Sequence, residues 1–214
     1  MEREKDWADE AEQRVLDQAL ALVPSLGWTR RMVIAAAKAE GLSQGEAELL
    51  LPHGPRDLAA LLSRRHDAVA LAALSAVDPM SLKIRQRIRA AVAARLEAAA
   101  ADQEAARRWA GYLALPTHLT LGLRLLWDSA DTLWRWAGDT ATDENHYSKR
   151  LILSEILVSS LAIRLSDGEA AALAHLDGRI DAVMAFEKWK AGLKFGDVAA
   201  GVARALGRLR YGAL

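Results

Sequence analysis

The stretch GWTRRMVIAAAKAEGLSQGEAELL, residues 27–50, decides the fold. Thr29 stands where it can cap a helix over about 30–40, and Gly41 is expected to end that helix. Ser43 can cap a second short helix, because Glu46 occupies the capping-box position three residues later. Two short helices joined by a glycine turn predict a helix-turn-helix.

The sequence on both sides of this stretch is helical as well. Residues about 4–22 are predicted to form a helix that Pro24 and Gly27 stop. Further helices are predicted over about 56–76, over 80–115 as one helix or as two with a joint near Ala101, and over 117–137, 149–167, 169–190 and 194–210. The segment 149–167 is apolar almost all round, so we expect it to be deeply buried. No run alternates with period two, and the sequence therefore predicts an all-α protein.

The spacing of the first 75 residues resembles the N-terminal domain of TetR-family regulators. That resemblance implies a TetR-regulator-like helical bundle, in which the helical remainder of the chain would bind a ligand. The composition fits a helical protein, since alanine is frequent and β-branched residues are few.

Charge and cysteine content exclude several classes of function. The 28 Lys and Arg residues balance 28 Asp and Glu residues, whereas nucleic-acid-binding proteins usually carry a basic excess. The chain has no cysteine, which excludes disulfides, thiol catalysis and cysteine-containing zinc sites. No apolar run reaches about 18 residues, and the N-terminal sequence resembles neither a signal nor a transit peptide. We therefore expect a soluble, cytoplasmic protein.

The second helix of the predicted helix-turn-helix lacks the chemistry of a recognition helix. It carries Glu46 and Glu48, which repel phosphates, and only Gln44 is suited to base reading. We expect no nucleic acid among the partners. The alternative function for this chain is that of a TetR-type ligand-responsive transcriptional regulator.

Neither a catalytic site nor a metal site is predicted. The string GLSQG, residues 41–45, matches the G-x-S-x-G nucleophile pattern, but that pattern has meaning only between a strand and a helix. Asp139, Asp143 and His146 fall at helical spacing and could in principle hold a cation, yet such residues at a helix start are more often caps. There is no E-x-x-H motif and no glycine-rich phosphate loop. We expect no cofactor and no enzymatic activity, with an unrecognised hydrolase or metalloenzyme as a further open class.

The predicted helices over 117–137 and 149–167 carry more apolar surface than one packed face needs. A ligand pocket between helices and a dense core that contains tryptophan explain this surface equally well. If a lipid pocket is present, we expect it to be lined by Leu119, Leu123, Leu126, Trp127, Trp134, Leu153, Ile156 and Leu157.

The last predicted helix is amphipathic, with arginines on its polar face. Such a helix suits binding to a membrane surface, although a terminal helix also commonly docks back onto its own bundle. The residues predicted to bind the membrane are Phe195, Val198, Val202, Leu206 and Leu209.

A polar elbow, WAGDTATDENHYSKR, residues 136–150, lies between the two apolar helices. Together with the preceding LALPTHLTLGLRLLWDSADTLWR, it resembles the ubiquinone-biosynthesis accessory family known as coenzyme Q biosynthesis protein nine. The shared pattern consists of an L-P-x-[HN] entry, a W-x-[WY]-A-G-D corner and a T-D-x-N-x-Y-[ST]-[KR]-R continuation. Residues 27–50 also look like the weaker N-terminal pattern of that family.

The resemblance implies a homodimer that binds isoprenoid quinone or phospholipid in a helical cavity and uses a C-terminal amphipathic helix at membranes. It also implies a partner, the di-iron demethoxyubiquinone hydroxylase, which family members dock through the elbow. By matched position the docking residues are Asp139, Tyr147 and Arg150, and we add His146, which stands where eukaryotic relatives carry Trp. Tyr147 and Arg150 are three apart and are expected to share one helix face. In the competing reading Asp139 and Asp143 are caps and Tyr147 packs inward.

The sequence thus predicts a non-catalytic accessory protein of ubiquinone biosynthesis, which presents a precursor lipid to a membrane-associated hydroxylase. It is expected to associate peripherally with the inner membrane. Its predicted parts are a helix-turn-helix-like subdomain over 1–76, a helical lipid-binding bundle over 77–192 and an amphipathic membrane helix over 193–214.

Overall fold

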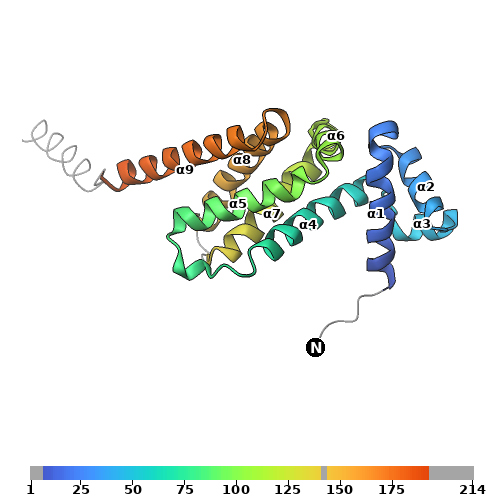
Figure 1. The fold of residues 1–214 in the computed structure, drawn as a ribbon, viewed down its shortest axis with the longest axis horizontal. Helices are drawn as coiled ribbons and strands as arrows, with labels where there is room; N and C mark the ends of the chain where they lie inside the picture. Colours follow the sequence, from blue (N-terminus) through green and yellow to red (C-terminus); the bar gives the residue numbers. More distant parts are fainter. Residues whose placement is uncertain (1–6, 141–143, 193–214) are drawn as a thin grey trace, which may run out of the picture. The chain divides into compact units, whose positions relative to one another are not determined.

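The computed structural model describes residues 7–140 and 144–192, and within these residues it contains helices and no strand (Figure 1). The chain divides into two compact units, Met1–Leu176 and Asp177–Leu214. The predicted all-α fold is confirmed, and the arrangement of the helices is consistent with a TetR-regulator-like bundle. The domain boundaries predicted at 76 and 192 stay predictions.

The N-terminal part contains α1 (Trp7–Leu26), α2 (Arg30–Ala39), α3 (Gln44–Leu50) and α4 (Pro55–Ala73). After a short 3-10 helix, η1 (Pro79–Ser81), come α5 (Ile84–Ala100) and α6 (Gln103–Ala114). The described chain continues with α7 (Leu119–Trp136), α8 (Glu144–Ser166) and α9 (Glu169–Gly192). The stretch predicted as one helix or two over 80–115 is therefore two helices, α5 and α6, with the joint at the predicted position near Ala101.

Local capping signals determine where the early helices begin. The Thr29 side chain accepts a hydrogen bond from the Met32 N–H, as expected for an N-cap. At α3 both halves of the capping box are present: Ser43 Oγ accepts from the Glu46 N–H, and the Ser43 N–H donates to Glu46 Oε2. The predictions for these two caps are confirmed, and Ser43 serves as a helix cap.

Two predictions about the helices are wrong. Pro24 does not stop the first helix, since α1 continues to Leu26. A proline so near the C-terminal end removes one helical hydrogen bond, and the chain leaves the helix at Gly27, where φ is +65°. The segment 149–167 is not deeply buried all round, because Leu151 is 67% and Val158 48% exposed in α8.

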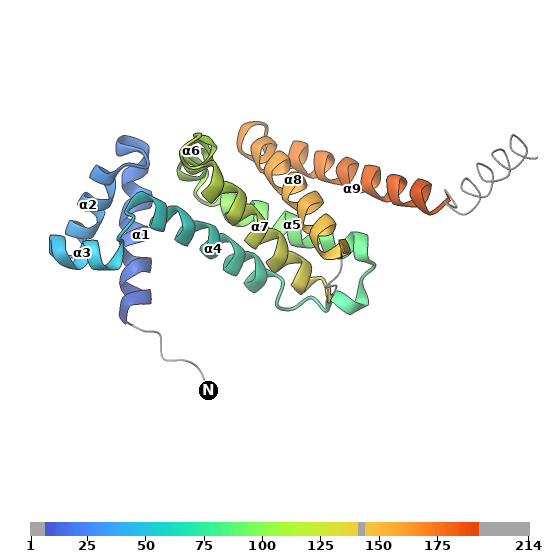
Figure 2. The same ribbon diagram turned by 180° about the vertical axis from the view of Figure 1, so that it is seen from behind.

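One hydrophobic core joins the helix-turn-helix to the bundle. Helices α1, α2 and α3 lie together at one end, and α4 runs from them to α5 and α7 (Figures 1 and 2). The indole N–H of Trp28 donates to the carbonyl of Ala105, and that of Trp109 donates to the carbonyl of Ala59. Since both indoles are buried and both N–H groups have acceptors, α6 is fixed against both parts of the fold.

Candidate functional site

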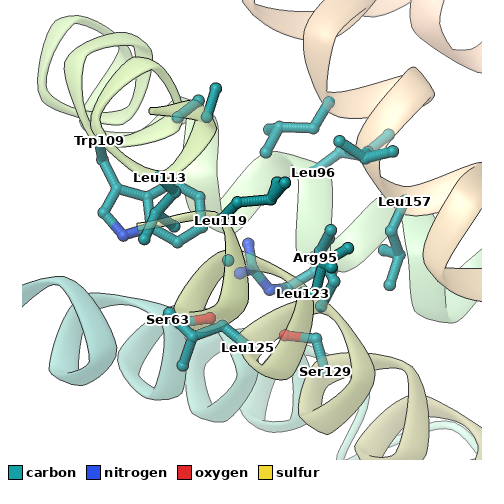
Figure 3. Close-up of a pocket in the computed structure, with 16 residues that line it drawn as sticks. Ser63, Arg95, Leu96, Trp109, Leu113, Leu119, Leu123, Leu125, Ser129 and Leu157 are labelled. Atoms are coloured by element: carbon teal, nitrogen blue, oxygen red, sulfur yellow. The ribbon is translucent and has the colours of Figure 1, made fainter. Parts of the chain in front are cut away.

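An apolar cavity of about 270 Å³ lies within the first unit, among α4, α5, α6, α7 and α8 (Figure 3). Leucines make up half of the residues that line it, and the indole of Trp109 completes one side. Leu119, Leu123 and Val158 line the cavity and are also exposed at the protein surface, so they mark its mouth. One water molecule occupies about 30 Å³ in the liquid. If each non-hydrogen group of a chain takes the same volume, the cavity holds a chain of about nine groups.

Half of the residues predicted to bind lipid line this cavity, namely Leu119, Leu123, Leu126 and Leu157. The other four lie elsewhere. Leu153 and Ile156 are buried in α8 away from the cavity wall. The Trp134 indole donates to the carbonyl of Lys149, and Trp127 packs against other aromatic rings. The structure does not place these four in the cavity wall, and a lipid-binding role for the four leucines that line it stays a prediction.

Three polar residues, Ser63, Arg95 and Ser129, line one side of the cavity (Figure 3). Arg95 is buried, and its Nε donates to Asp67 Oδ1 at 2.6 Å. Ser129 Oγ donates to the same carboxylate, 2.8 and 2.9 Å from its two oxygens. Burial raises the pKa of Asp67, and the positive charge and hydrogen bond of Arg95 oppose that rise. We name Asp67, Arg95 and Ser129 the polar floor.

The sequence did not point to the polar floor. Asp67 sits in the charged run SRRHDA, which looks like a solvated helix face, and its partners lie 28 and 62 residues further along the chain. From the sequence, a buried polar site can be recognised only as a polar or charged residue at a helical position that is expected to be buried. Such a residue does not reveal which distant side chain it bonds to.

His66 lies beside the polar floor and is 2% exposed. Neither of its ring nitrogens has a hydrogen-bond partner among the described residues, and its ring meets that of Trp109 edge-on at 5.9 Å between centroids. Burial, aided by the charges of Arg95 and Arg65, lowers the pKa of His66 to about 3. The imidazole is therefore neutral at physiological pH.

The elbow is held by a buried network of ion pairs. At Gly138, where φ is +87°, the chain turns back after α7. The Asp139 carboxylate then accepts hydrogen bonds from Lys149 Nζ at 2.5 Å and from Arg150 Nη1 at 2.8 Å. Arg150 Nε donates to Asp131 at 2.7 Å. Burial alone would raise the pKa of Asp139, but the hydrogen bonds from Lys149 and Arg150 outweigh it and hold that pKa below its usual range.

The network separates the four predicted docking residues into two pairs. The side chains of Asp139 and Arg150 are 4% and 2% exposed, whereas Tyr147 is 64% exposed. Tyr147 and Arg150 do not form one exposed patch, because Arg150 turns inward to the carboxylates of Asp131 and Asp139. A docking role for either residue stays a prediction. The competing expectation that Tyr147 packs inward is wrong. Asp143 lies outside the described residues.

Tyr147 belongs to a group of three rings at the surface, which we call the aromatic patch (Trp127, His146 and Tyr147). The Tyr147 ring lies 5.2 Å from His146, edge-on, and 6.0 Å from Trp127, centroid to centroid. Trp127 lies 6.3 Å from His146. Aromatic residues are enriched at protein interfaces and among their energetic hot spots, so the patch has a composition suited to docking.

The surface of α3 carries acidic and neutral polar groups engaged with each other. Glu46 is held by Ser43, and Glu48 accepts a hydrogen bond from Gln44 and lies 3.9 Å from Arg30. The one side chain of this helix that could read bases, Gln44, is thus already bonded to a carboxylate. The absence of a nucleic-acid partner stays a prediction.

The described residues contain neither a metal-binding cluster nor a membrane-spanning helix. No group of three or more His, Asp or Glu side chains within them is arranged to hold a metal ion. None of their helices combines the length and the hydropathy needed to cross a membrane. The predicted membrane-binding residues, Phe195, Val198, Val202, Leu206 and Leu209, lie outside the part of the chain that the structure describes.

Comparison with known proteins gives a consistent set of similarities. The family model described as COQ9 matches residues 119–187, which include α7, the elbow and α8. The chain is 31% identical to ubiquinone biosynthesis protein COQ9-B, mitochondrial, of Xenopus laevis, over 78% of this chain and 59% of that protein. It is 30% identical to ubiquinone biosynthesis protein COQ9, mitochondrial, of Rattus norvegicus and of Homo sapiens, each over 78% of this chain and over 56% and 55% of those proteins. The alignments thus span less than two thirds of the length of each of these relatives.

Proposed function

The chain belongs to the COQ9 family, and from that premise we propose that it is a non-catalytic lipid-binding accessory protein of ubiquinone biosynthesis. It holds an isoprenoid quinone precursor or a phospholipid in the cavity and presents the precursor to the membrane-associated hydroxylase that oxidises demethoxyubiquinone. The names of its relatives support the assignment to ubiquinone biosynthesis. The apolar cavity supports the proposed binding of a lipid.

The observation that carries the proposal is the apolar wall of the cavity together with its exposed apolar mouth. Burial of hydrocarbon is favourable by roughly 25 cal/mol for each Å² of apolar surface removed from water. A chain in the cavity would gain this energy from its own surface and from the exposed leucines at the mouth. A long isoprenoid or acyl chain exceeds a capacity of about nine groups, so its remainder would emerge past Leu119 and Leu123.

Filling the cavity should abolish lipid binding. Ala110 lines the wall, and Ala110→Phe introduces a phenyl ring of six carbons, about two thirds of the cavity's capacity at the same volume per group. We expect mass spectrometry of the purified protein to detect bound lipid with the parent and little or none with the variant.

Trp127→Ala is the control, because Trp127 lies in the aromatic patch and not in the cavity wall. This variant should retain the lipid. A parent protein purified without any lipid, or an Ala110→Phe variant as loaded as the parent, would contradict the proposal.

The aromatic patch is the proposed docking surface for the hydroxylase. Tyr147→Ala removes a mostly exposed ring, so the free energy of unfolding should change by no more than about 0.5 kcal/mol. Loss of an interface hot spot should weaken binding of the hydroxylase by about 2 kcal/mol or more, close to 30-fold. Surface plasmon resonance with the immobilised hydroxylase measures the second effect, and thermal melting measures the first.

Leu49→Ala is a matched control, because Leu49 on α3 is even more exposed than Tyr147 and lies outside the patch. It should bind the hydroxylase as the parent does. If Tyr147→Ala also binds with parental affinity, the docking surface lies elsewhere.

The remaining parts of the proposal concern assembly. We propose a homodimer that associates peripherally with the membrane through the predicted amphipathic segment 193–214. Asp139 and Arg150 then support docking indirectly, because their ion pairs hold the start of α8, on which His146 and Tyr147 lie.

A further inference from the structure

The polar floor presents unused hydrogen-bond donors to an otherwise apolar cavity. The bond from Arg95 Nε to Asp67 uses one N–H of five that the guanidinium carries. The terminal nitrogens, Nη1 and Nη2, have no hydrogen-bond acceptor among the described residues, and Arg95 lines the cavity. An acceptor supplied by a ligand in the cavity would complete the hydrogen bonding of this cation.

The charge of the floor restricts which acceptor fits. Asp67 bonds to Arg95 but does not line the cavity; it lines a polar hollow formed by residues of α4 and α7 and the loop before α4. When both groups are ionised, their charges cancel. A ligand carboxylate or phosphate would add a second negative charge to one arginine, leaving an unpaired buried charge. An uncharged oxygen would accept a hydrogen bond from the cation with no change in net charge.

We propose that the cavity selects lipids whose inserted end is an uncharged oxygen acceptor, a carbonyl, ether or hydroxyl oxygen bound by Arg95, and rejects chains that end in a carboxylate or phosphate. Asp67 is the specificity determinant, because it neutralises Arg95 without touching the ligand. Ser129 holds the Asp67 carboxylate in place. The inference rests on the proposed lipid-binding function and names the chemistry of the lipid end that enters first.

Two probes of equal chain length test this selectivity. Full-length protein stripped of lipid is titrated calorimetrically with 1-decanol and with decanoate at pH 7, since a chain of about ten groups matches the cavity. We expect 1-decanol to bind at least about tenfold more tightly than decanoate, the equivalent of one hydrogen bond to a charged group.

Asp67→Asn should reverse the preference. The variant keeps the shape of the side chain but leaves Arg95 as an unbalanced cation, so decanoate should now bind more tightly than 1-decanol. Asp128→Asn is the matched control, because Asp128 lines the same polar hollow but is exposed and pairs with Arg124. It should retain the preference of the parent.

A double variant, Arg95→Met with Asp67→Leu, separates recognition from folding. Replacement of a buried ion pair by apolar side chains of similar size is often neutral or stabilising, so this protein should remain folded by circular dichroism. It should bind 1-decanol about tenfold more weakly than the parent does.

The outcomes distinguish failure of the proposed selectivity from failure of the proposed lipid-binding function. Equal affinity of the parent for both probes, or an unchanged preference in Asp67→Asn, overturns the selectivity and leaves a cavity that binds chains of any kind. No change in 1-decanol affinity in the double variant overturns it as well. Failure of the parent to bind either probe overturns the lipid-binding function itself.

Discussion

Arg150→Met will lower the free energy of unfolding by about 3–5 kcal/mol, the usual effect of removing one partner from a buried ion pair. Arg150 is 2% exposed and bonds to two carboxylates, Asp131 at 2.7 Å and Asp139 at 2.8 Å. Without the guanidinium, the buried carboxylate of Asp139 keeps the partly exposed Lys149 as its partner but loses its buried partner. Urea denaturation monitored by circular dichroism measures the loss.

Arg135→Met is a matched control, because Arg135 pairs with the same carboxylate, Asp131, at 2.6 Å. Its side chain is 72% exposed, and exposed pairs contribute at most about 1 kcal/mol. If Arg150→Met unfolds at the same urea concentration as Arg135→Met, then the buried network does not stabilise the elbow.

The second large effect is a loss of stability below neutral pH that depends on His66. The pKa of its imidazole is about 3 in the folded protein, against about 6.5 in an unfolded chain. Between these values the unfolded state binds more protons than the folded state, so the free energy of unfolding falls as the pH falls. The limiting slope is about 1.4 kcal/mol per pH unit, and the integrated loss is about 2 kcal/mol between pH 7 and pH 5.

Chemical denaturation between pH 7 and pH 5 tests this effect above the range where Asp139 titrates. His66→Leu removes the ionisable ring along with two nitrogens that lack partners, so its stability should be nearly flat over this range. His53→Gln, at an exposed position on the surface, should leave the slope unchanged. If the stability of the parent protein depends on pH no more than that of His66→Leu, the pKa of His66 is not lowered by burial.

The sequence predicted the features of the fold that depend on near neighbours. Thr29 and the Ser43–Glu46 capping box are local motifs, and the structure has them as predicted. The helix end predicted at Pro24 was wrong, because a proline in the last turn of a helix removes only one hydrogen bond and need not end the helix.

The candidate site was only half predictable, for a physical reason. Leucines at helical spacing identified the cavity wall on α7, but the same spacing does not reveal how that helix is rotated against α8. Trp127 therefore appeared beside Leu123 and Leu126 as a wall residue, although it faces His146 and Tyr147. The pairing of Arg95 with Asp67 and the inward turn of Arg150 depend on contacts between helices distant in sequence, which no local pattern encodes.

The shared core described for Trp28 and Trp109 makes the helix-turn-helix a requirement for the stability of the bundle. The hydrogen bond from Trp28 to Ala105 and the packing of Met32 and Leu58 into one cluster make α1, α2 and α4 structural parts of the bundle. Removal of this module would expose apolar side chains of the bundle interior. The inward sides of α1, α2 and α4 are therefore needed for folding, whereas α3 has no fully buried residue and its outward side contributes little to the core.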